Sequence, residues 1–457
     1  MATNAPQSLF RAGQGWRARY RERGQIVVFA AALAPVILGL TGLAVDFGFA
    51  AHQRGKAANA ADAAALAGAD VLLNGGTVDQ AETASLTYAE NNGYQKSEIT
   101  VQIPPLTGPH AGMDGFVAVR ISHQQPTIFM RALLVDSVHI SARAVAGYLT
   151  SPKNYALVVL DKTACSAYTQ SSNSTLTIND GGMLVNSSRN PSATQSGGST
   201  VTGEYLDYYD QGGWQLNNNA TTSPPPEPVL QQIADPLAGL PRPVPCTSTT
   251  TYTPPGCNVL QSTDSAGTQA SPKQTHISVN SNSPSTLHPG VYWGGLKIDG
   301  NGGGTVTFLP GTYIFAGGGS NSGGFTYTGT ADLSGSGVTF YNTDDPQATS
   351  SSNQPCGAYS LSGGGTLSFT APTSGTWQNM LFWQSDSCNQ TFTYSGGPNT
   401  TAGVIYLPTA QLSVSGGGNL GAMQIIVDTF TYSGSAPLTI NYTDYVTIQP
   451  PWLALVE

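Results

Sequence analysis

The segment GGGTVTFLPGTYIFA, residues 302–316, contains two short strand-like runs separated by a Pro-Gly turn. Its parts recur in the C-terminal two-thirds of the chain: PGTY at 310–313 repeats PGVY at 289–292, and GGGTLSFTAP at 363–372 echoes GGGTVTFLP. From Pro152 onward, β-branched and aromatic runs of this kind alternate with Gly, Ser, Asn and Pro. Such runs indicate many short strands joined by turns, and no helical period of useful length interrupts them.

A second repeated unit supports a stacked architecture. FTYTG at residues 325–329 returns as FTYSG at 392–396 and at 430–434. A repeat of about 20 residues built from short strands suits one coil of a β-helix, in which each coil hydrogen-bonds to the next. Stacking places like side chains together and therefore penalises charge. We expect a mainly β fold, a right-handed parallel β-helix over residues 151–457; a sandwich or jelly roll is the alternative.

The composition agrees with a weakly charged β protein. Of 457 residues only 9% are charged, while Gly (54) and Pro (30) are abundant. This excludes a coiled coil or a helix-rich enzyme, which need many charged helix formers. The net charge of −9, with no Lys or Arg after Lys297, makes a nucleic-acid partner unexpected because phosphate binding needs clustered cations.

An apolar run follows an Arg-rich N-terminus. IVVFAAALAPVILGLTGLAV has Ile26 and Val45 at its ends and carries no charge. Twenty helical residues cover about 30 Å, the thickness of a bilayer's hydrocarbon core. We expect a cytoplasmic basic segment (1–25), a transmembrane helix (26–49) and the rest of the chain outside, following the positive-inside bias. A cleaved signal peptide is the alternative, but its apolar region is shorter.

Residues 21–69 resemble the N-terminal segment of TadG-like proteins from the tight-adherence (Tad/Flp) pilus-assembly systems of bacteria. The likeness rests on Arg-Gly before the apolar run, AVDFG after it and the helix AANAADAAALAGA. It implies a single-pass inner-membrane protein that helps build or anchor a surface fibre, with the lipid bilayer and other Tad proteins as partners. Segments such as HPGVYWGGLKIDGNG and LPGTYIFAGGG also resemble the β-helical C-terminal regions of some TadG-like proteins.

Residues 50–150 are expected to continue the helix and then form a small α/β module. TVDQAETASLTYAENNGY has helical spacing, whereas EITVQI, GFVAVRIS and VHISARAVAGY alternate with period two. A short helix is expected around residues 128–134. The pattern resembles a pilin-like head.

Some TadG-like proteins carry a von Willebrand A domain, and Asp161, Thr163 and Cys165 follow a buried-type strand here. The cysteine is a poor ligand for Mg²⁺, and no long helices alternate with the strands, so we do not expect that domain.

Residues 214–288 interrupt the strand pattern with proline-rich stretches, and we expect a long surface excursion there. Five cysteines lie beyond the apolar run, in what would be an oxidising compartment. Cys246 with Cys257, and Cys356 with Cys388, are candidate disulfides, which leaves Cys165 over; connectivity cannot be fixed from sequence.

The sequence matches no complete catalytic motif. Asn342, Thr343, Asp344 and Asp345 resemble one element of polygalacturonases, but the companion Gly-His and Arg-Ile-Lys elements are missing. We predict no catalytic residue, metal site or cofactor. The expected function is a membrane-anchored structural or assembly component of a Tad/Flp pilus. An anchored adhesin or glycan-binding protein is the alternative, which exposed aromatic rows would favour; a carbohydrate-active β-helix enzyme is third, which two converging carboxylates in a cleft would favour.

Overall fold

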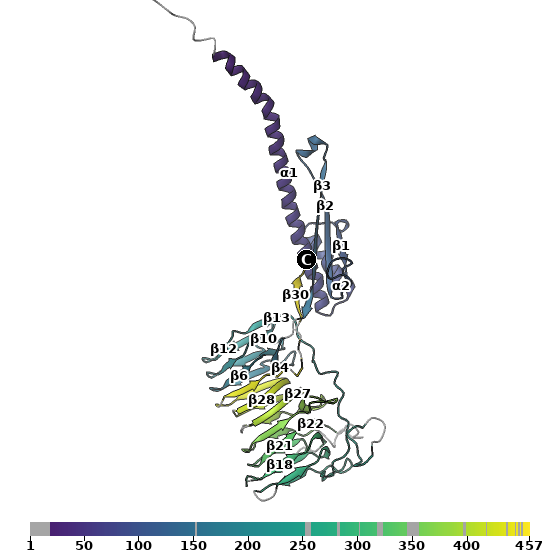
Figure 1. Cartoon of the computed structure of the whole chain (residues 1–457), viewed down its shortest axis with the longest axis vertical. Coiled ribbons are helices and arrows are strands. Elements are labelled where there is room, and N and C mark those ends of the chain that lie inside the picture. The colour runs from purple at the N-terminus through teal and green to yellow at the C-terminus, as the bar shows by residue number, and fades with distance from the viewer. Residues whose placement is uncertain are drawn as a thin grey trace, which may run out of the picture. The chain divides into compact units, whose positions relative to one another are not determined.

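The structure is a computed structural model, and its chain divides into two compact units (Figure 1). The N-terminal unit comprises residues 1–149 with 453–457, and the body comprises residues 150–452. The structure describes residues 19–150, 153–251, 257–280, 284–300, 302–317, 323–344, 356–395, 399–416, 418–435, 437–443, 445, 446, 448 and 451–457.

The N-terminal unit consists of one long helix beside a helix and a small sheet. The sheet order is β1-β2-β3-β30, with antiparallel β1–β2 and β2–β3 pairs. Its elements are α1 (Arg19–Leu73), α2 (Val78–Asn91), the 3-10 helices η1 (Lys96–Glu98) and η2 (Met130–Leu133), and strands β1 (Ile99–Gln102), β2 (Phe116–Pro126), β3 (Ser137–Thr150) and β30 (Pro451–Leu455). The predicted apolar helix therefore exists and runs without a break into the Ala-rich segment. Residues 453–457, which the sequence assigned to the β-rich body, belong to this unit because Val456 donates its backbone N–H to the carbonyl oxygen of Val145 at 2.8 Å.

The body confirms the mainly β class and contains long parallel sheets. Most strands pair in parallel with the third strand along the chain, as β16 does with β19 and β19 with β22, so the strands form three sheets. The described residues of the body contain no helix, and antiparallel sandwiches and jelly rolls do not have this register. The arrangement is compatible with a β-helix of three strands per coil, and its right-handed sense stays a prediction.

The three sheets share the two longest strands, which cross all three faces: β27 (Asn399–Val414) and β28 (Gly418–Ser433). Sheet I also holds β4 (Tyr155–Val159), β7 (Gly182–Val185), β10 (Leu206–Tyr209), β13 (Glu227–Val229), β16 (Gly290–Trp293), β19 (Gly311–Ala316), β22 (Val338–Thr343) and β25 (Met380–Gln384). Sheet II holds β5 (Tyr168–Ser171), β8 (Ala193–Gln195), β11 (Trp214–Leu216), β14 (Thr275–Ser278), β17 (Leu296–Asp299), β20 (Phe325–Tyr327), β23 (Tyr359–Leu361) and β26 (Phe392–Tyr394). Sheet III holds β6 (Thr175–Asn179), β9 (Thr200–Thr202), β12 (Thr221–Ser223), β15 (Ser285–Leu287), β18 (Thr305–Phe308), β21 (Asp332–Ser336), β24 (Leu367–Thr370) and β29 (Leu438–Asn441).

The order of strands in the stack differs from their order in the chain. β28 pairs with β27 on one side and with β4 on the other, so the last rungs of the body dock against its first rungs. Figure 1 shows this directly: β27 and β28 lie in the middle of the stack, between β4 and β22. The chain enters mid-stack, stacks outward to β13, crosses to the far end at β14 and stacks back to β28 and β29.

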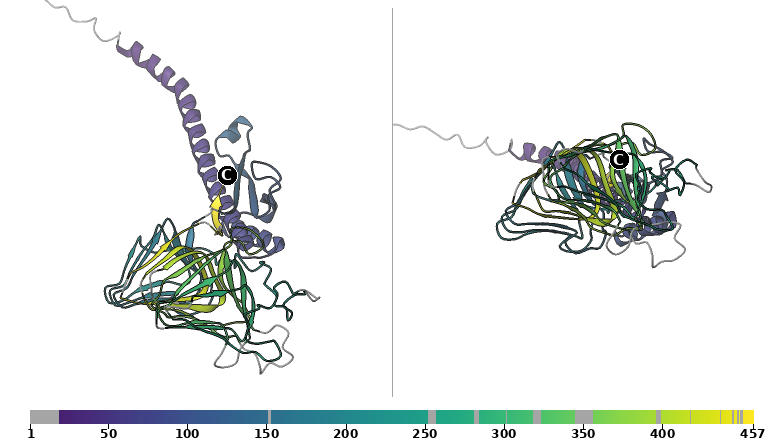
Figure 2. Two further views of the ribbon diagram at one scale, coloured as in Figure 1. Left: turned by 60° about the horizontal axis from the view of Figure 1, so that its bottom comes forward. Right: turned by 90° about the horizontal axis from the view of Figure 1, so that it is seen from below.

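The interior explains the sequence repeats. Val306, Leu333 and Leu367 pair in register, as do Phe308, Gly335 and Phe369, so the two GGGT-type segments occupy the same positions two rungs apart. Aromatic side chains fill the space that the sheets enclose, and Phe340 contacts the ring of Phe382 at a centroid distance of 5.2 Å. Figure 2 shows the strands wound around this shared interior.

Sheet I is apolar on both faces, because a segment of the chain covers its outer side. We call residues 230–274 the strap; residues 252–256 lie outside the described residues. Ile233 and Val259 of the strap are buried in a cluster with residues of sheet I such as Trp383 and Ile426. Strands covered on both faces have near-continuous apolar sequences, as in β4 (YALVV), whose five residues are all buried.

The strap is shorter than the excursion expected over residues 214–288. Trp214 pairs with Ala193 and Thr221 with Thr200, so the rungs continue as far as Val229 before the strap begins. Proline interrupted the strand pattern in this region of the sequence, but β13 carries Pro228 at the end of the stack, where a strand needs fewer donors.

Candidate functional site

The Ala-rich end of α1 is a packing surface. Ala57, Ala61, Ala64 and Ala65 are fully buried against α2 and β2, and their spacing places them on one helix face. A Cβ on Gly68 would lie 2.2 Å from Oγ of Ser85, so the two helices approach too closely for a larger residue. The AANAADAAALAGA segment thus fixes α1 to the small sheet.

Asp46, within the AVDFG motif, binds a distant loop of the same unit. Its carboxylate accepts hydrogen bonds from the backbone N–H groups of Ile128 (3.1 Å), Phe129 (2.8 Å) and Met130 (2.6 Å). These donors precede and begin η2, where the N–H groups of a helix start have no partner within the helix. Asp46 is 6% exposed and therefore caps η2 from a residue more than eighty positions earlier in the chain.

Gly42 lies one turn before Asp46 on the same face of α1. A Cβ at this position would lie 2.7 Å from Cγ of Phe129, so only glycine admits the ring at this distance. Gly42 and Asp46 together form the contact site on α1 for residues 128–130, and we call the hydrogen bonds of Asp46 to these residues the Asp46 clamp. In the sequence, AVDFG is visible only as part of the family likeness, although a lone acidic residue at the end of an apolar run is the signal that marks this contact.

The body buries most of its aromatic side chains, either in its interior or between sheet I and the strap. Trp293, Tyr168, Tyr313 and Phe325 are among the largest fully buried side chains, and no Phe, Tyr or Trp is among the exposed residues in the described part of the body. The exposed aromatic rows that would favour a glycan-binding surface are therefore not found there.

Sheet II instead presents hydroxyl groups outward. Successive rungs place a Ser or Thr at the same outward position, and we call these seven part-exposed residues the hydroxyl row: Thr326, Ser360, Thr393, Ser413, Thr431, Thr169 and Thr194. Neighbouring strands of a sheet lie about 4.8 Å apart, so the row is a regular array.

In the polygalacturonase-like element, residues 342–345, Asn342 and Asp344 make hydrogen bonds to neighbouring segments of the body. Asn342 is buried, and its Nδ2 donates to the carbonyl oxygen of Gly357 at 2.6 Å and to Oε1 of Gln384 at 3.1 Å. Asp344 accepts from Oγ of Ser387 at 2.8 Å, and Asp345 lies outside the described residues. Asn342 thus bonds between rungs.

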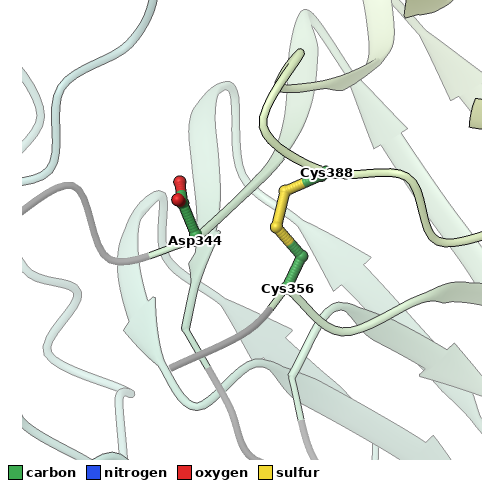
Figure 3. Close-up of side chains that lie close together, drawn as sticks. All are labelled: Asp344, Cys356 and Cys388. Carbon is green, nitrogen blue, oxygen red and sulfur yellow. A yellow bond between two sulfur atoms is a disulfide. The ribbon is translucent and has the colours of Figure 1, made fainter. Parts of the chain in front are cut away.

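Cys356 and Cys388 lie beside Asp344 and are joined as a disulfide (Figure 3). In this bonded form neither sulfur is a thiolate, so the three residues offer one carboxylate rather than a metal-ligand set. Cys246 and Cys257 form a second disulfide with a Cα–Cα distance of 5.1 Å, and Cys165 is free and exposed.

Asp161 and Asp428 are neighbouring carboxylates near the seam between β4 and β28. Burial, followed by the charge of Asp161, raises the pKa of Asp428 to about 6. Asp161 accepts from the backbone N–H groups of Thr163 (2.7 Å) and Ala164 (2.6 Å), so the Asp-x-Thr-x-Cys stretch forms a turn.

The described residues thus combine one candidate membrane anchor, a small sheet packed on the same helix, and a β-rich body. Helix α1 is long and apolar enough to cross a membrane from Val27 onward. Residues 24–71 match the family described as putative Flp pilus-assembly TadE/G-like, and the chain therefore carries a TadE/G-like domain over its apolar helix. Comparisons with curated proteins and with solved structures give no match.

Proposed function

We propose that this chain is a membrane-anchored structural or assembly component of a Tad/Flp-type pilus. The observation that carries the proposal is the TadE/G-like match over residues 24–71, which coincides with the apolar part of α1 and its Ala-rich packing surface. Such a domain points to a structural or assembly role rather than to catalysis.

In the proposed topology α1 crosses the bacterial inner membrane with its N-terminus in the cytoplasm. Arg11, Arg17, Arg19, Arg21 and Arg23 precede the apolar run, and positive residues next to a span are retained in the cytoplasm. The sheet of the N-terminal unit and the body then lie in the periplasm or beyond it.

Deletion of the gene is the direct test. We expect a strain without the chain to lose pilus fibres, the full chain to restore them and a version lacking residues 24–71 to fail. A pulldown with the full chain is expected to capture pilus-machinery proteins and to lose them in the shortened version. Normal fibres in the deletion strain would contradict the proposal.

An anchored adhesin is the second candidate, and the hydroxyl row is the observation that favours it. A regular line of Ser and Thr hydroxyls can donate to and accept from the hydroxyl groups of a glycan. Replacing Ser360, Thr393 and Ser413 by Ala tests this: adhesion to a glycan-coated surface should fall while fibre number stays unchanged. Unchanged adhesion would contradict the adhesin function and leave the assembly role as the only proposal.

A further inference from the structure

We propose that the tip of the β2–β3 hairpin, residues 127–136, is embedded in the outer leaflet of the bilayer beside α1. The hairpin tip would act as a second, non-spanning membrane anchor whose occupant is lipid acyl chains. This inference rests on the proposed function, because it requires α1 to span the membrane.

The hairpin tip exposes apolar side chains. Leu134 is 92% exposed, Leu133 70% and Ile128 67%, and Phe129 and Val135 are also exposed. The lipid-facing candidates on α1 have similar exposure, for example Phe29 at 66%. Contiguous exposed apolar residues of this kind mark an interaction surface.

The position of the hairpin tip along α1 sets its depth. An apolar hollow is lined by Pro35, Leu38 and Leu43 of α1 and by Phe129 and Leu133 of the tip. Figure 1 shows the end of the β2–β3 hairpin beside α1. We take Val45 as the outer end of the span. At 1.5 Å per residue, the α1 segment that lines the hollow, from Leu43 to Pro35, then lies about 3–15 Å below that end. The outer leaflet's share of the hydrocarbon core is about 15 Å. The hairpin tip therefore lies at the level of acyl chains.

The backbone of the hairpin tip is suited to an apolar solvent. Non-helical backbone is costly in lipid unless its polar groups are paired. Asp46 takes the N–H groups of residues 128–130. Thr127 donates to Asp136, Ala132 to Phe129, Leu134 to Arg131 and Val135 to Met130 through their backbones. Most N–H groups of the tip thus have a partner within the N-terminal unit.

The two charges of the hairpin tip also fit an interfacial location. Arg131 and Asp136 form an ion pair at 3.4 Å between Nε and Oδ1, and both side chains are more than 70% exposed. A long Arg side chain can extend its guanidinium to the phosphate groups while its stem stays among the acyl chains.

Lipid is a better occupant than a protein surface because the exposed face of the tip continues the face of α1. Both line one hollow, and the proposed span already places that part of α1 in acyl chains. Asp46 and Gly42 hold the tip at this level, since one supplies the hydrogen bonds and the other the space for Phe129.

Depth-dependent fluorescence quenching tests the proposal. The purified full chain, with Cys165→Ser to remove the free thiol, receives one cysteine at Leu133 or Ile128 and an environment-sensitive fluorophore. It is reconstituted in phosphatidylcholine–phosphatidylglycerol vesicles with or without doxyl-labelled lipid. Phe29→Cys serves as the span probe, and Leu106→Cys, an equally exposed apolar residue (71%) between β1 and β2, is the matched control.

We expect blue-shifted emission and at least about twofold stronger lipid quenching at Leu133 and Ile128 than at Leu106. If Phe29 is quenched but both tip probes behave like Leu106, the inference is overturned and the proposed anchor stands. If Phe29 is not quenched, the proposed span itself fails. Tip probes shielded from aqueous iodide but unaffected by doxyl lipid would mean that protein covers the tip, which also overturns the inference.

The Asp46 clamp gives a second readout. Asp46→Asn keeps the size of the side chain but replaces one acceptor oxygen by a donor, so the three N–H groups lose part of their pairing. Lipid quenching at Leu133 should fall while quenching at Phe29 stays constant. Quenching at Leu133 that is the same in Asp46→Asn and Asp46→Ala as in the parent would contradict the role of the clamp.

Discussion

The backbone N–H of Lys153 donates to the carbonyl oxygen of Ile448 at 3.0 Å, in an antiparallel bridge between the two ends of the body. Both ends of the body therefore lie together, although some three hundred residues separate them. This follows from the order of the stack, in which β28 and β29 dock on β4, β5 and β6. It also explains how the body can be inserted between β3 and β30 of the N-terminal unit.

The seam between β28 and β4 should be essential for stability. Ile426 is fully buried and pairs with Val158 across the seam. Ile426→Ala should lower the free energy of unfolding by about 2–5 kcal/mol, because it leaves a cavity in a packed sheet. Ser433→Ala on the exposed end of the same strand is the matched control and should change it by less than about 0.5 kcal/mol. Denaturant titration of the detergent-solubilised chain measures both; equal effects would contradict the seam.

The strap should be held to the body by Asn186. Its Nδ2 donates to the carbonyl oxygen of Ile233 at 3.0 Å, and its Oδ1 accepts from the N–H of Ile233 at 2.8 Å. Asn186→Ala leaves these buried backbone groups unpaired and should cost about 1–3 kcal/mol. Limited proteolysis should then cut within residues 230–274 faster than in the parent. Gln215→Ala, an exposed amide on β11, should leave the cutting rate unchanged, and equal rates in all three proteins would contradict the role of Asn186.

Asp428 should make the body more stable at acidic pH. Its pKa is raised to about 6, first by burial and then by Asp161, whereas an unfolded Asp titrates near 3.9. Between these two pH values the folded state holds a proton that the unfolded state has released. The contribution of Asp428 to the free energy of unfolding is therefore complete below pH 4 and is lost as the pH rises through 6.

Asp428→Asn should therefore raise the free energy of unfolding at pH 8 by roughly 1–2 kcal/mol and leave it nearly unchanged at pH 4. Thermal melts at the two pH values measure the difference. Asp344→Asn, a carboxylate away from the seam, is the control. A stabilisation that is equal at both pH values would contradict the assigned cause.

The two disulfides should differ in their effect on stability. Cys356 and Cys388 close a loop with a sequence separation of 32, against 11 for Cys246 and Cys257. In the chain-entropy account, removing the disulfide that closes the longer loop lowers the free energy of unfolding by about 4 kcal/mol, and removing the other lowers it by about 3 kcal/mol. Non-reducing peptide mapping of the purified chain should find both pairs, and melting of the two double Cys→Ser variants should rank them. A mapped pair that includes Cys165 would contradict this connectivity.

The sequence predicted the fold better than it predicted the sites. The repeats Val306–Phe308 and Leu367–Phe369 are visible because stacked rungs require like side chains at like positions. The order of the stack was not predictable, since pairing Leu157 with Ile425 joins segments that no local pattern relates. The Asp46 clamp was missed because its partners are backbone groups far along the chain, so the lone Asp after the apolar run revealed only one side of the contact.

In the proposed topology α1 spans the inner membrane, with the N-terminus in the cytoplasm and the body on the periplasmic side. The exposed native thiol of Cys165 in the body tests this topology most directly. A membrane-impermeant maleimide should label Cys165 in spheroplasts with an intact inner membrane. In a Cys165→Ser chain with Ser8→Cys, the same reagent should label only after the inner membrane is lysed. Labelling of Cys165 that also requires lysis, or labelling of residue 8 before it, would contradict the account.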